Sequence, residues 1–143
     1  MKLNRIQSIR TNNFKDTEML EKIQHVWKEA YQQQQQQDAA STLYGVYYDY
    51  ESNYKGDYSL STAVANDHRS AESLDIPEDA PYRIFQVNGT DKQKVLQQWK
   101  QIWQLEESGE LIRAYTVDYE KYEPDGTVSI HIAVAPDSSE NAV

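Results

Sequence analysis

The sequence contains no cysteine and only five glycines, four prolines and two phenylalanines. Without cysteine the chain has no disulfide, no thiolate metal site and no cysteine nucleophile. Three isolated histidines, His25, His68 and His131, lack the grouping of a zinc site. No segment approaches the roughly 18 consecutive apolar residues of a membrane span, and residues 1–5 lead into no apolar signal core. We therefore expect no metal, no cofactor, no membrane association and a cytoplasmic location.

Positively charged residues are scarce as well. Lys and Arg number 14 against 23 Asp and Glu, which gives a formal net charge of −9. A field of this sign repels a phosphate backbone, so a nucleic-acid binder that relies on charge is disfavoured. We expect no direct binding to nucleic acid.

Tyrosine and tryptophan are abundant. The 11 Tyr and 3 Trp are large, half-apolar side chains, each able to bury a wide surface while its polar tip stays wet. They offset the low content of Phe, Leu, Ile and Val, which together with the net charge lies near the composition of disordered chains. A chain of 143 residues with this composition predicts one folded domain with a Tyr-rich interior or cleft.

The first half of the chain has the pattern of a strand, a helix and a hairpin. Residues 3–11 form the first strand, and Asp16 can cap the helix that follows, whose apolar residues recur at helical spacing. Six Gln, residues 32–37, favour an exposed end to this helix. Residues 43–51 and 58–65 are rich in strand formers on either side of a turn, which predicts a β-hairpin.

A polar connector, residues 66–81, separates this half from a second one with the same order. The second half has a strand at 82–87, a helix after a capping box of Thr90 and Gln93, strands at 111–122 and 127–135, and a disordered tail at 136–143. Each half thus predicts strand, helix, strand, strand.

Local matches between the halves support a duplication. Trp27 and Trp99 are each followed by Lys in the two helices, and Asp-Tyr-Glu occurs in both hairpins. We predict an α+β fold in which duplicated β-α-β-β units, about 3–65 and 82–135, form a curved antiparallel sheet with two main helices and a groove between the halves. The chain, 1–143, is interpreted as a single domain.

The alternation of side chains assigns faces to the last two strands. One face of the final strand is apolar and is predicted to pack on the helices: Val128, Ile130, Ile132 and Val134. In the preceding strand Val117 is the most apolar residue, so its side is also assigned to the helices. The opposite side is then assigned to the groove. It holds Ala114, Thr116, Asp118, Glu120 and Tyr122, joined from the first half by Gly45, Tyr47, Asp49 and Glu51.

A groove with aromatic walls and carboxylates suits an organic cation. Each good contact of a cation with a Tyr or Trp face is worth roughly 0.5–2 kcal/mol. A carboxylate at the bottom matches the charge of a cation and disfavours anions. We therefore predict a small organic molecule as the partner, one that is cationic, with Glu120 as the key charge.

At this point the sequence resembles a family, the gyrase-inhibitor-like small-molecule-binding superfamily. The resemblance rests on residues 9–13 before the Trp27 helix, on residues 44–51 before Tyr58, and on residues 118–122 before the final strand. It covers about residues 5–135. The branch that it resembles most is that of the integron-associated effector-binding proteins, which are related to the effector-binding domains of AraC-type, multidrug-sensing transcription activators.

The resemblance implies a stand-alone effector-binding domain with a ligand pocket between the two halves. It implies aromatic walls and a buried Glu that neutralises lipophilic or aromatic cations, a role that Glu120 matches. The implied ligand-binding residues are Glu120, Tyr122, Tyr47, Tyr82, Trp103 and Asp118. The family's activators also carry a helix-turn-helix unit, for which we expect no room here, so a partner regulator or a homodimer would carry any signal.

Two other readings of the sequence remain open. A carboxylate in an aromatic pocket can act as a general base, so a small hydrolase of reactive electrophiles that uses Glu120, with Asp118 on the same strand face, is one alternative. An acidic protein-interaction or inhibitor module is the other. These readings differ in whether the acidic residues spread over the outside or converge in a cleft.

Overall fold

The computed structural model describes residues 1–37, 40–65, 73–77, 79–87 and 92–135. Its elements are β1 (Lys2–Thr11), α1 (Met19–Gln37), β2 (Leu43–Tyr48), β3 (Tyr58–Val64), β4 (Ser73–Asp75), β5 (Tyr82–Val87), α2 (Lys92–Glu107), β6 (Asp118–Tyr122) and β7 (Val128–Ala133). The predicted cap at Thr90, the tail at 136–143 and His68 lie outside the described residues.

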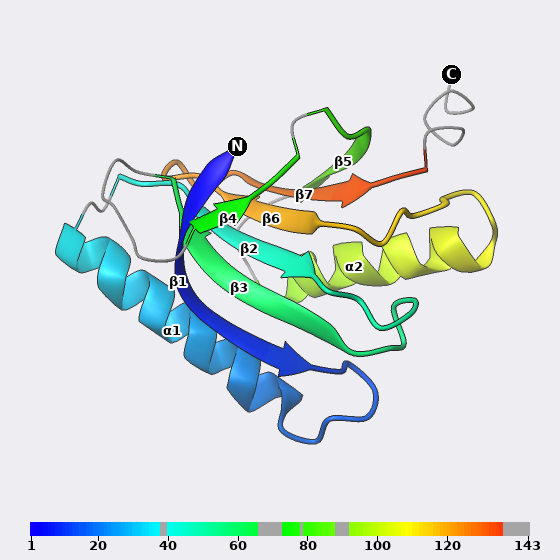
Figure 1. Ribbon diagram of the computed structural model, residues 1–143, viewed down its shortest axis with the longest axis horizontal. Helices are drawn as coiled ribbons and strands as arrows, with labels where there is room; N and C mark the ends of the chain where they lie inside the picture. The colour runs from blue at the N-terminus through cyan, green and yellow to red at the C-terminus, as the bar shows by residue number, and fades with distance from the viewer. Residues whose placement is uncertain (38–39, 66–72, 78, 88–91, 136–143) are drawn as a thin grey trace.

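The strands form one antiparallel sheet in the order β4-β1-β3-β2-β6-β7-β5. The sheet is curved, and α1 and α2 lie on the same side of it (Figure 1). The predicted α+β fold, with a curved antiparallel sheet and two main helices, is confirmed. Strand, helix, strand, strand occurs twice along the chain, and the two halves meet where β2 pairs with β6. Gly45 lies directly opposite Glu120 at this seam.

The start and the buried face of α1 follow from its sequence. A carboxylate oxygen of Asp16 accepts the backbone N–H of Glu18 at 2.9 Å, and the carbonyl of Asp16 accepts that of Met19 at 3.2 Å. These bonds satisfy donors that an uncapped helix start leaves unpaired. The helix buries Val26, Trp27 and Ala30 against β3, and the glutamines extend it to Gln37.

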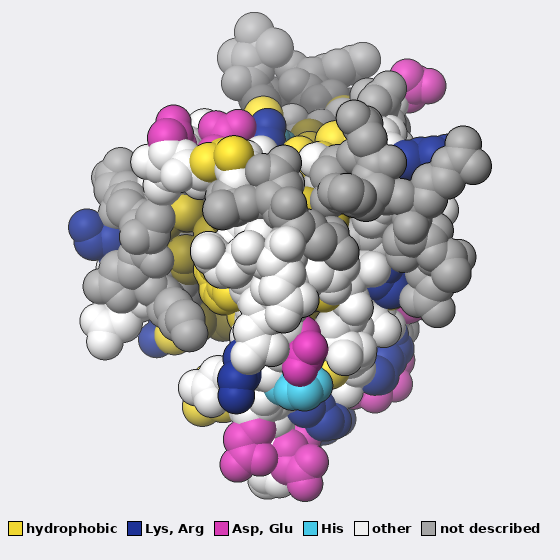
Figure 2. All heavy atoms as spheres, turned by 90° about the vertical axis from the view of Figure 1, so that its left-hand side faces the viewer, with side chains coloured by type: hydrophobic (Ala, Val, Ile, Leu, Met, Phe, Trp, Pro, Cys, Tyr) yellow, Lys and Arg dark blue, Asp and Glu magenta, His cyan; other side chains and the backbone are white. Residues whose placement is uncertain are grey.

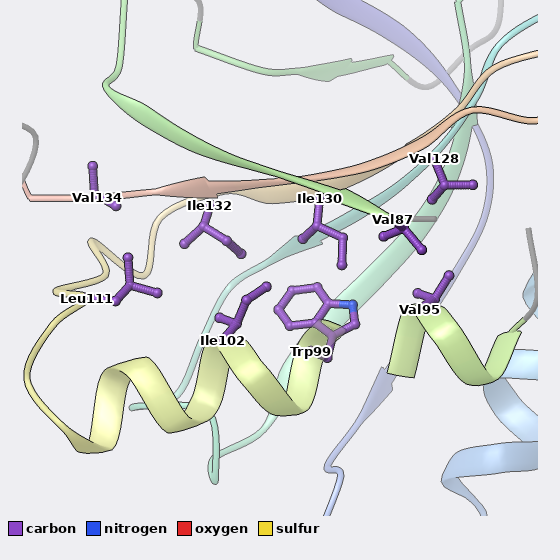
Figure 3. Close-up of a cluster of buried hydrophobic side chains, with 9 residues drawn as sticks. All are labelled: Val87, Val95, Trp99, Ile102, Leu111, Val128, Ile130, Ile132 and Val134. Atoms are coloured by element: carbon purple, nitrogen blue, oxygen red, sulfur yellow. The ribbon is translucent and has the colours of Figure 1, made fainter. Parts of the chain in front are cut away.

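Helix α2 packs on β5 and β7 through a second hydrophobic cluster (Figure 3). Trp99 and Ile102 point from the helix toward Ile130 and Ile132 on the sheet. Both isoleucines of β7 have no exposed surface, and Ile102 is equally buried. The prediction that the face containing Ile130 and Ile132 packs on a helix is therefore confirmed.

A third cluster covers the face of the sheet that points away from the helices. Its buried residues come from β1, β2, β3, β4 and the segment after β4: Leu3, Tyr44, Val46, Ala63, Leu74 and Ile76. Within the polar connector, the sequence analysis missed β4, whose Leu74 pairs with Leu3 of β1. The N-terminal ammonium donates to the carbonyl of Ile76 at 2.8 Å, which holds the same segment against the sheet.

The predicted strand at 111–122 is wrong over its first part, since β6 begins only at Asp118. Arg113 makes one isolated bridge with Val134, and Tyr115 has a φ of 55° in the left-handed region. A residue in that region interrupts a strand. The interruption accompanies a buried ion pair between Arg113 and Asp118, which periodicity does not reveal.

The face assigned to Val117 is also wrong. Val117 and Tyr119 pack against the third cluster, on the face away from the helices. Glu120 pairs with Ile130, so it lies on the same face as the residues under α2. The assignment failed because it assumed a single apolar face, whereas this sheet is covered on both sides.

Candidate functional site

A cavity of about 360 Å³ lies between α1 and α2, above the seam of β2 and β6. Helix α1 supplies Met19, Leu20, Ile23, Gln24, Trp27 and Tyr31, and α2 supplies Val95, Leu96, Trp99 and Trp103. The strands and loops supply Asn13, Tyr47, Tyr50, Tyr54, Tyr58, Arg113, Glu120 and Tyr122. Most of these side chains are aromatic or aliphatic, so the cavity is an apolar space with very few charged groups.

Glu120 lies in this cavity at the centre of the sheet and is only 3% exposed. One carboxylate oxygen accepts the indole N–H of Trp99 at 2.6 Å and the hydroxyl of Tyr47 at 3.0 Å. The other accepts the hydroxyl of Tyr122 at 3.0 Å. Three uncharged donors from α2, β2 and β6 therefore hold the carboxylate in place.

Burial determines the acid–base state of this group. Desolvation raises the pKa of Glu120, and the hydrogen bonds from Trp99, Tyr122 and Tyr47 oppose that rise without cancelling it. Burial likewise raises the pKa of Tyr47 and that of Tyr122 well above the ordinary value for tyrosine, and the charge of Glu120 adds to both rises. Both phenols are therefore protonated at neutral pH and remain donors to the carboxylate.

Gly45 allows the close approach of Trp27 to the sheet. A Cβ at this position would lie 2.7 Å from Cζ2 of Trp27 and 3.3 Å from Oε1 of Glu120. Only a residue without a side chain fits between the indole ring and the carboxylate. The glycine at the seam thus helps to shape the floor of the cavity.

The aromatic side chains that form the walls of the cavity pack against one another. Trp27 meets Tyr122 edge-on with ring centroids 4.8 Å apart, and Trp99 meets Tyr47 in the same way at 5.2 Å. Such edge-to-face pairs leave ring faces free for other contacts and are worth about 0.5–1.5 kcal/mol each. A tryptophan from each helix therefore packs on a tyrosine beside Glu120.

The charges at one end of the cavity are paired among themselves. The guanidinium of Arg113 donates to Asp118 at 2.7 Å and to Glu106 at 3.1 Å, and its side chain is 2% exposed. Asp118 also accepts the hydroxyl of Tyr50 at 2.5 Å and the backbone N–H of Ala133 at 2.7 Å. This network joins β6 and β7 to the segment between α2 and β6.

Four of the six residues that the sequence analysis named as ligand-binding line the cavity: Glu120, Tyr122, Tyr47 and Trp103. The structure does not bring Tyr82 or Asp118 to it. Tyr82 donates its hydroxyl to the carbonyl of Val117 at 2.9 Å and packs against Tyr119 on the opposite face of the sheet. Asp118 faces the helices but is fully buried by its own partners. His131 stacks on Tyr119 and also lies on that opposite face.

Sequence reasoning missed several residues that line the cavity. Trp27 and Trp99 lie at matching places in the two predicted helices, and each forms a wall beside Glu120. The sequence signal that could have identified them is that each is followed by Lys at a matching position in the two halves. Tyr50, Tyr54 and Arg113 reach the cavity through loop conformations that no periodic pattern reveals.

The distribution of acidic groups bears on the protein-interaction reading. Figure 2 shows one face of the molecule, where Asp and Glu side chains stand in small groups among Lys, Arg and uncharged side chains. Two carboxylates, those of Asp118 and Glu120, are buried instead. Among the described side chains on this face, the acidic ones form no continuous surface.

Two further classes of site were sought among the described residues. No three His, Cys, Asp or Glu side chains there gather in a way that could hold a metal ion. None of the described helices has the length and apolar character needed to cross a membrane.

Comparison with known proteins gives the family. Integron cassette protein VCH_CASS2, from the mobile metagenome of Vibrio cholerae, is 27% identical, with a TM-score of 0.76 over 94% of this chain and 90% of that one. SAV2435, in a structure with tetraphenylphosphonium bound, is 15% identical, with a TM-score of 0.69 over 99% and 93%, a likeness that shows the fold alone. No curated protein matches the sequence. The sequence model of the integron-associated effector binding proteins matches residues 6–134, and the chain belongs to that family.

Proposed function

We propose that this protein binds lipophilic organic cations in the cavity between α1 and α2, with Glu120 as the counter-charge. The observation that carries this proposal is a buried carboxylate in an aromatic cavity whose hydrogen-bond partners are all uncharged. In the described part of the chain, no Lys, Arg or His forms an ion pair with Glu120. A ligand that brings a positive charge would supply the missing partner.

The neighbouring charges favour the same ligand. Arg113 also reaches the cavity, but Asp118 and Glu106 together outweigh its charge. An anion would therefore meet a net negative environment, and a cation would not be repelled. The Trp and Tyr faces add cation–π attraction, which strengthens where water is excluded.

The comparisons support a small organic ligand. The family is one of effector-binding proteins, and SAV2435, which shares the fold, was solved with a lipophilic cation in place. We infer the preference for cations in this chain from its own Glu120. A cation-dependent contact with a partner regulator would then be the route from binding to a signal.

The hydrolase reading uses Glu120 as a general base on water, and it permits Asp118 as a second acid–base group without demanding one. The structure gives no specific support for that second group. Asp118 is held by Arg113, Tyr50 and the backbone of Ala133, so it is not available for acid–base work with Glu120. We therefore propose binding without turnover.

A thermal-shift titration tests the proposed function. Tetraphenylphosphonium should raise the melting temperature in a concentration-dependent manner, because a ligand that binds only the native state stabilises it by mass action. Glu120→Gln should lose most of this shift, whereas Glu110→Gln, which removes an exposed carboxylate on the segment after α2, should keep it. An equal shift in both variants would contradict the role of Glu120, and no shift in the wild type would contradict the proposed function.

A further inference from the structure

Large hydrophobic side chains stand exposed around the mouth of the cavity. Among the described residues, Leu20 is 66% exposed, Phe14 57%, Leu96 48% and Tyr31 44%. Three of them line the cavity, and the ring of Phe14 lies 6.0 Å from that of Trp103, which also lines it. Of the large exposed hydrophobic side chains that the structure describes, only Ile84 and Ile112 lie elsewhere. We call these four residues the apolar rim.

Exposed apolar side chains are common singly, but a group of them at one place marks an interaction site. The rim draws on both helices, since Leu20 and Tyr31 lie on α1 and Leu96 on α2, while Phe14 lies in the loop before α1. In the free protein each of these side chains keeps a large exposed surface, although Phe14 contacts Trp103 and Tyr31 contacts Trp27. Because they gather beside the cavity, the ligand of that cavity can cover them.

We propose that the rim binds the aliphatic chain of a cationic amphiphile whose ring-bearing, charged head lies against Glu120. This inference rests on the proposed function, because it extends the ligand of the same cavity. The rim is continuous with the cavity through Leu20, Tyr31 and Leu96, so one molecule can contact both. The negative charge lies deep and the aliphatic side chains lie at the mouth, an order that matches a charged head followed by an apolar tail.

A homologous series tests this order of groups. The affinities of methyl-, butyl-, hexyl- and octyl-triphenylphosphonium for the purified protein would be measured by isothermal titration calorimetry, below the concentrations at which they aggregate. Affinity should rise about twofold to fourfold per added methylene, as burial of an alkyl chain on a partly open surface provides, until the rim is covered. A flat series would overturn the inference.

Substitutions test whether the gain in affinity with chain length depends on the apolar rim. The double variant Leu20→Ser/Leu96→Ser should lose most of the gain in affinity with chain length, when each longer compound is compared with the methyl compound in the same variant. Ile112→Ser, a matched control that removes another exposed aliphatic side chain, should keep the wild-type gain. An unchanged gain in the double variant would overturn the inference.

Glu120→Gln separates this inference from the proposed function. It should weaken all four compounds by a common factor and leave the gain per methylene intact, because it removes the charge and not the rim. Failure of the wild-type protein to bind the methyl compound would overturn both proposals. Light scattering gives the last outcome: a dimeric wild type that becomes monomeric in Leu20→Ser/Leu96→Ser would show that a second copy covers the rim, which overturns the amphiphile as its occupant.

Discussion

Burial and hydrogen bonding act in opposite directions on the charge of Glu120. It is almost fully buried, which favours its protonated form, and it accepts three hydrogen bonds, which favour its ionised form. Burial is the larger effect, so its pKa lies above the ordinary range. A bound cation adds attraction to the ionised form alone and therefore lowers this pKa again.

Cation affinity should consequently depend on pH in one direction. The free folded state retains a proton on Glu120 above the ordinary value of 4.5, so binding of a permanently charged phosphonium must displace that proton as pH falls. The affinity should be highest well above the raised pKa and should decline as pH decreases through it. Titrations at several values between about pH 4.5 and pH 8 check this.

Glu120→Gln is the control for the pH titration, since its affinity should be weak and nearly independent of pH over the same range. The sign is opposite for folding: ionisation of Glu120 in the empty cavity costs stability as pH rises from 4.5 through the raised pKa. A wild-type affinity that is flat with pH would contradict the argument.

The segment between α2 and β6 shows how a buried ion pair shapes a strand. The side chain of Arg113 pairs with Asp118 and Glu106, and β6 begins where Asp118 accepts the backbone N–H of Ala133 on β7. Asp118 therefore joins one end of β6 to the neighbouring end of β7, the two strands that carry Glu120 and Ile130. We expect its role to be the positioning of β6, whereas the sequence analysis names it as a ligand contact.

Asp118→Asn should accordingly destabilise the fold and spare the affinity of the folded protein. Removing one partner of a buried pair costs about 3–5 kcal/mol, because the remaining charge stays desolvated. Chemical denaturation measures this cost. Glu123→Gln, which breaks the partly exposed pair of Lys121 and Glu123, should cost less than about 1 kcal/mol. A loss of phosphonium affinity in folded Asp118→Asn, with stability unchanged, would contradict this role.

Strand and helix order could be predicted because it depends on local patterns. The apolar alternation of β7 and the stripes of both helices place Ile130, Val26 and Ile102 in the core, where the structure has them. The break at Tyr115 and the short β4 depend on partners distant in sequence, which no local pattern contains.

The site was predictable only in part for the same reason. Glu120, Tyr47 and Tyr122 share a strand face, so alternation groups them correctly. The side on which that group lies was misassigned, because Val117 packs on a second apolar layer. Tyr82 shares the aromatic character of the cavity residues but lies on the other face, a distinction that composition cannot make. The duplication of the two halves stays a prediction.

Across the protein, the cavity depends on both halves at once. Helix α1 and β2 from the first half and α2 and β6 from the second each supply a side chain that touches Glu120 or forms the wall beside it. A ligand bound there contacts both helices, so it should strengthen the association of the two halves. The net charge of −9 adds a long-range attraction for cations, which salt weakens.

The most direct measurement compares two ligands of nearly the same shape and opposite charge. Calorimetric titration with tetraphenylphosphonium and with tetraphenylborate holds size and apolar surface almost constant, so the difference reports the charge of the cavity. We expect the cation to bind at least about a hundredfold more tightly, a difference of about 2.7 kcal/mol, and Glu120→Gln to remove most of this preference. Equal binding of the two ions, or a preference that persists in Glu120→Gln, would contradict the claim that Glu120 makes this cavity a cation site.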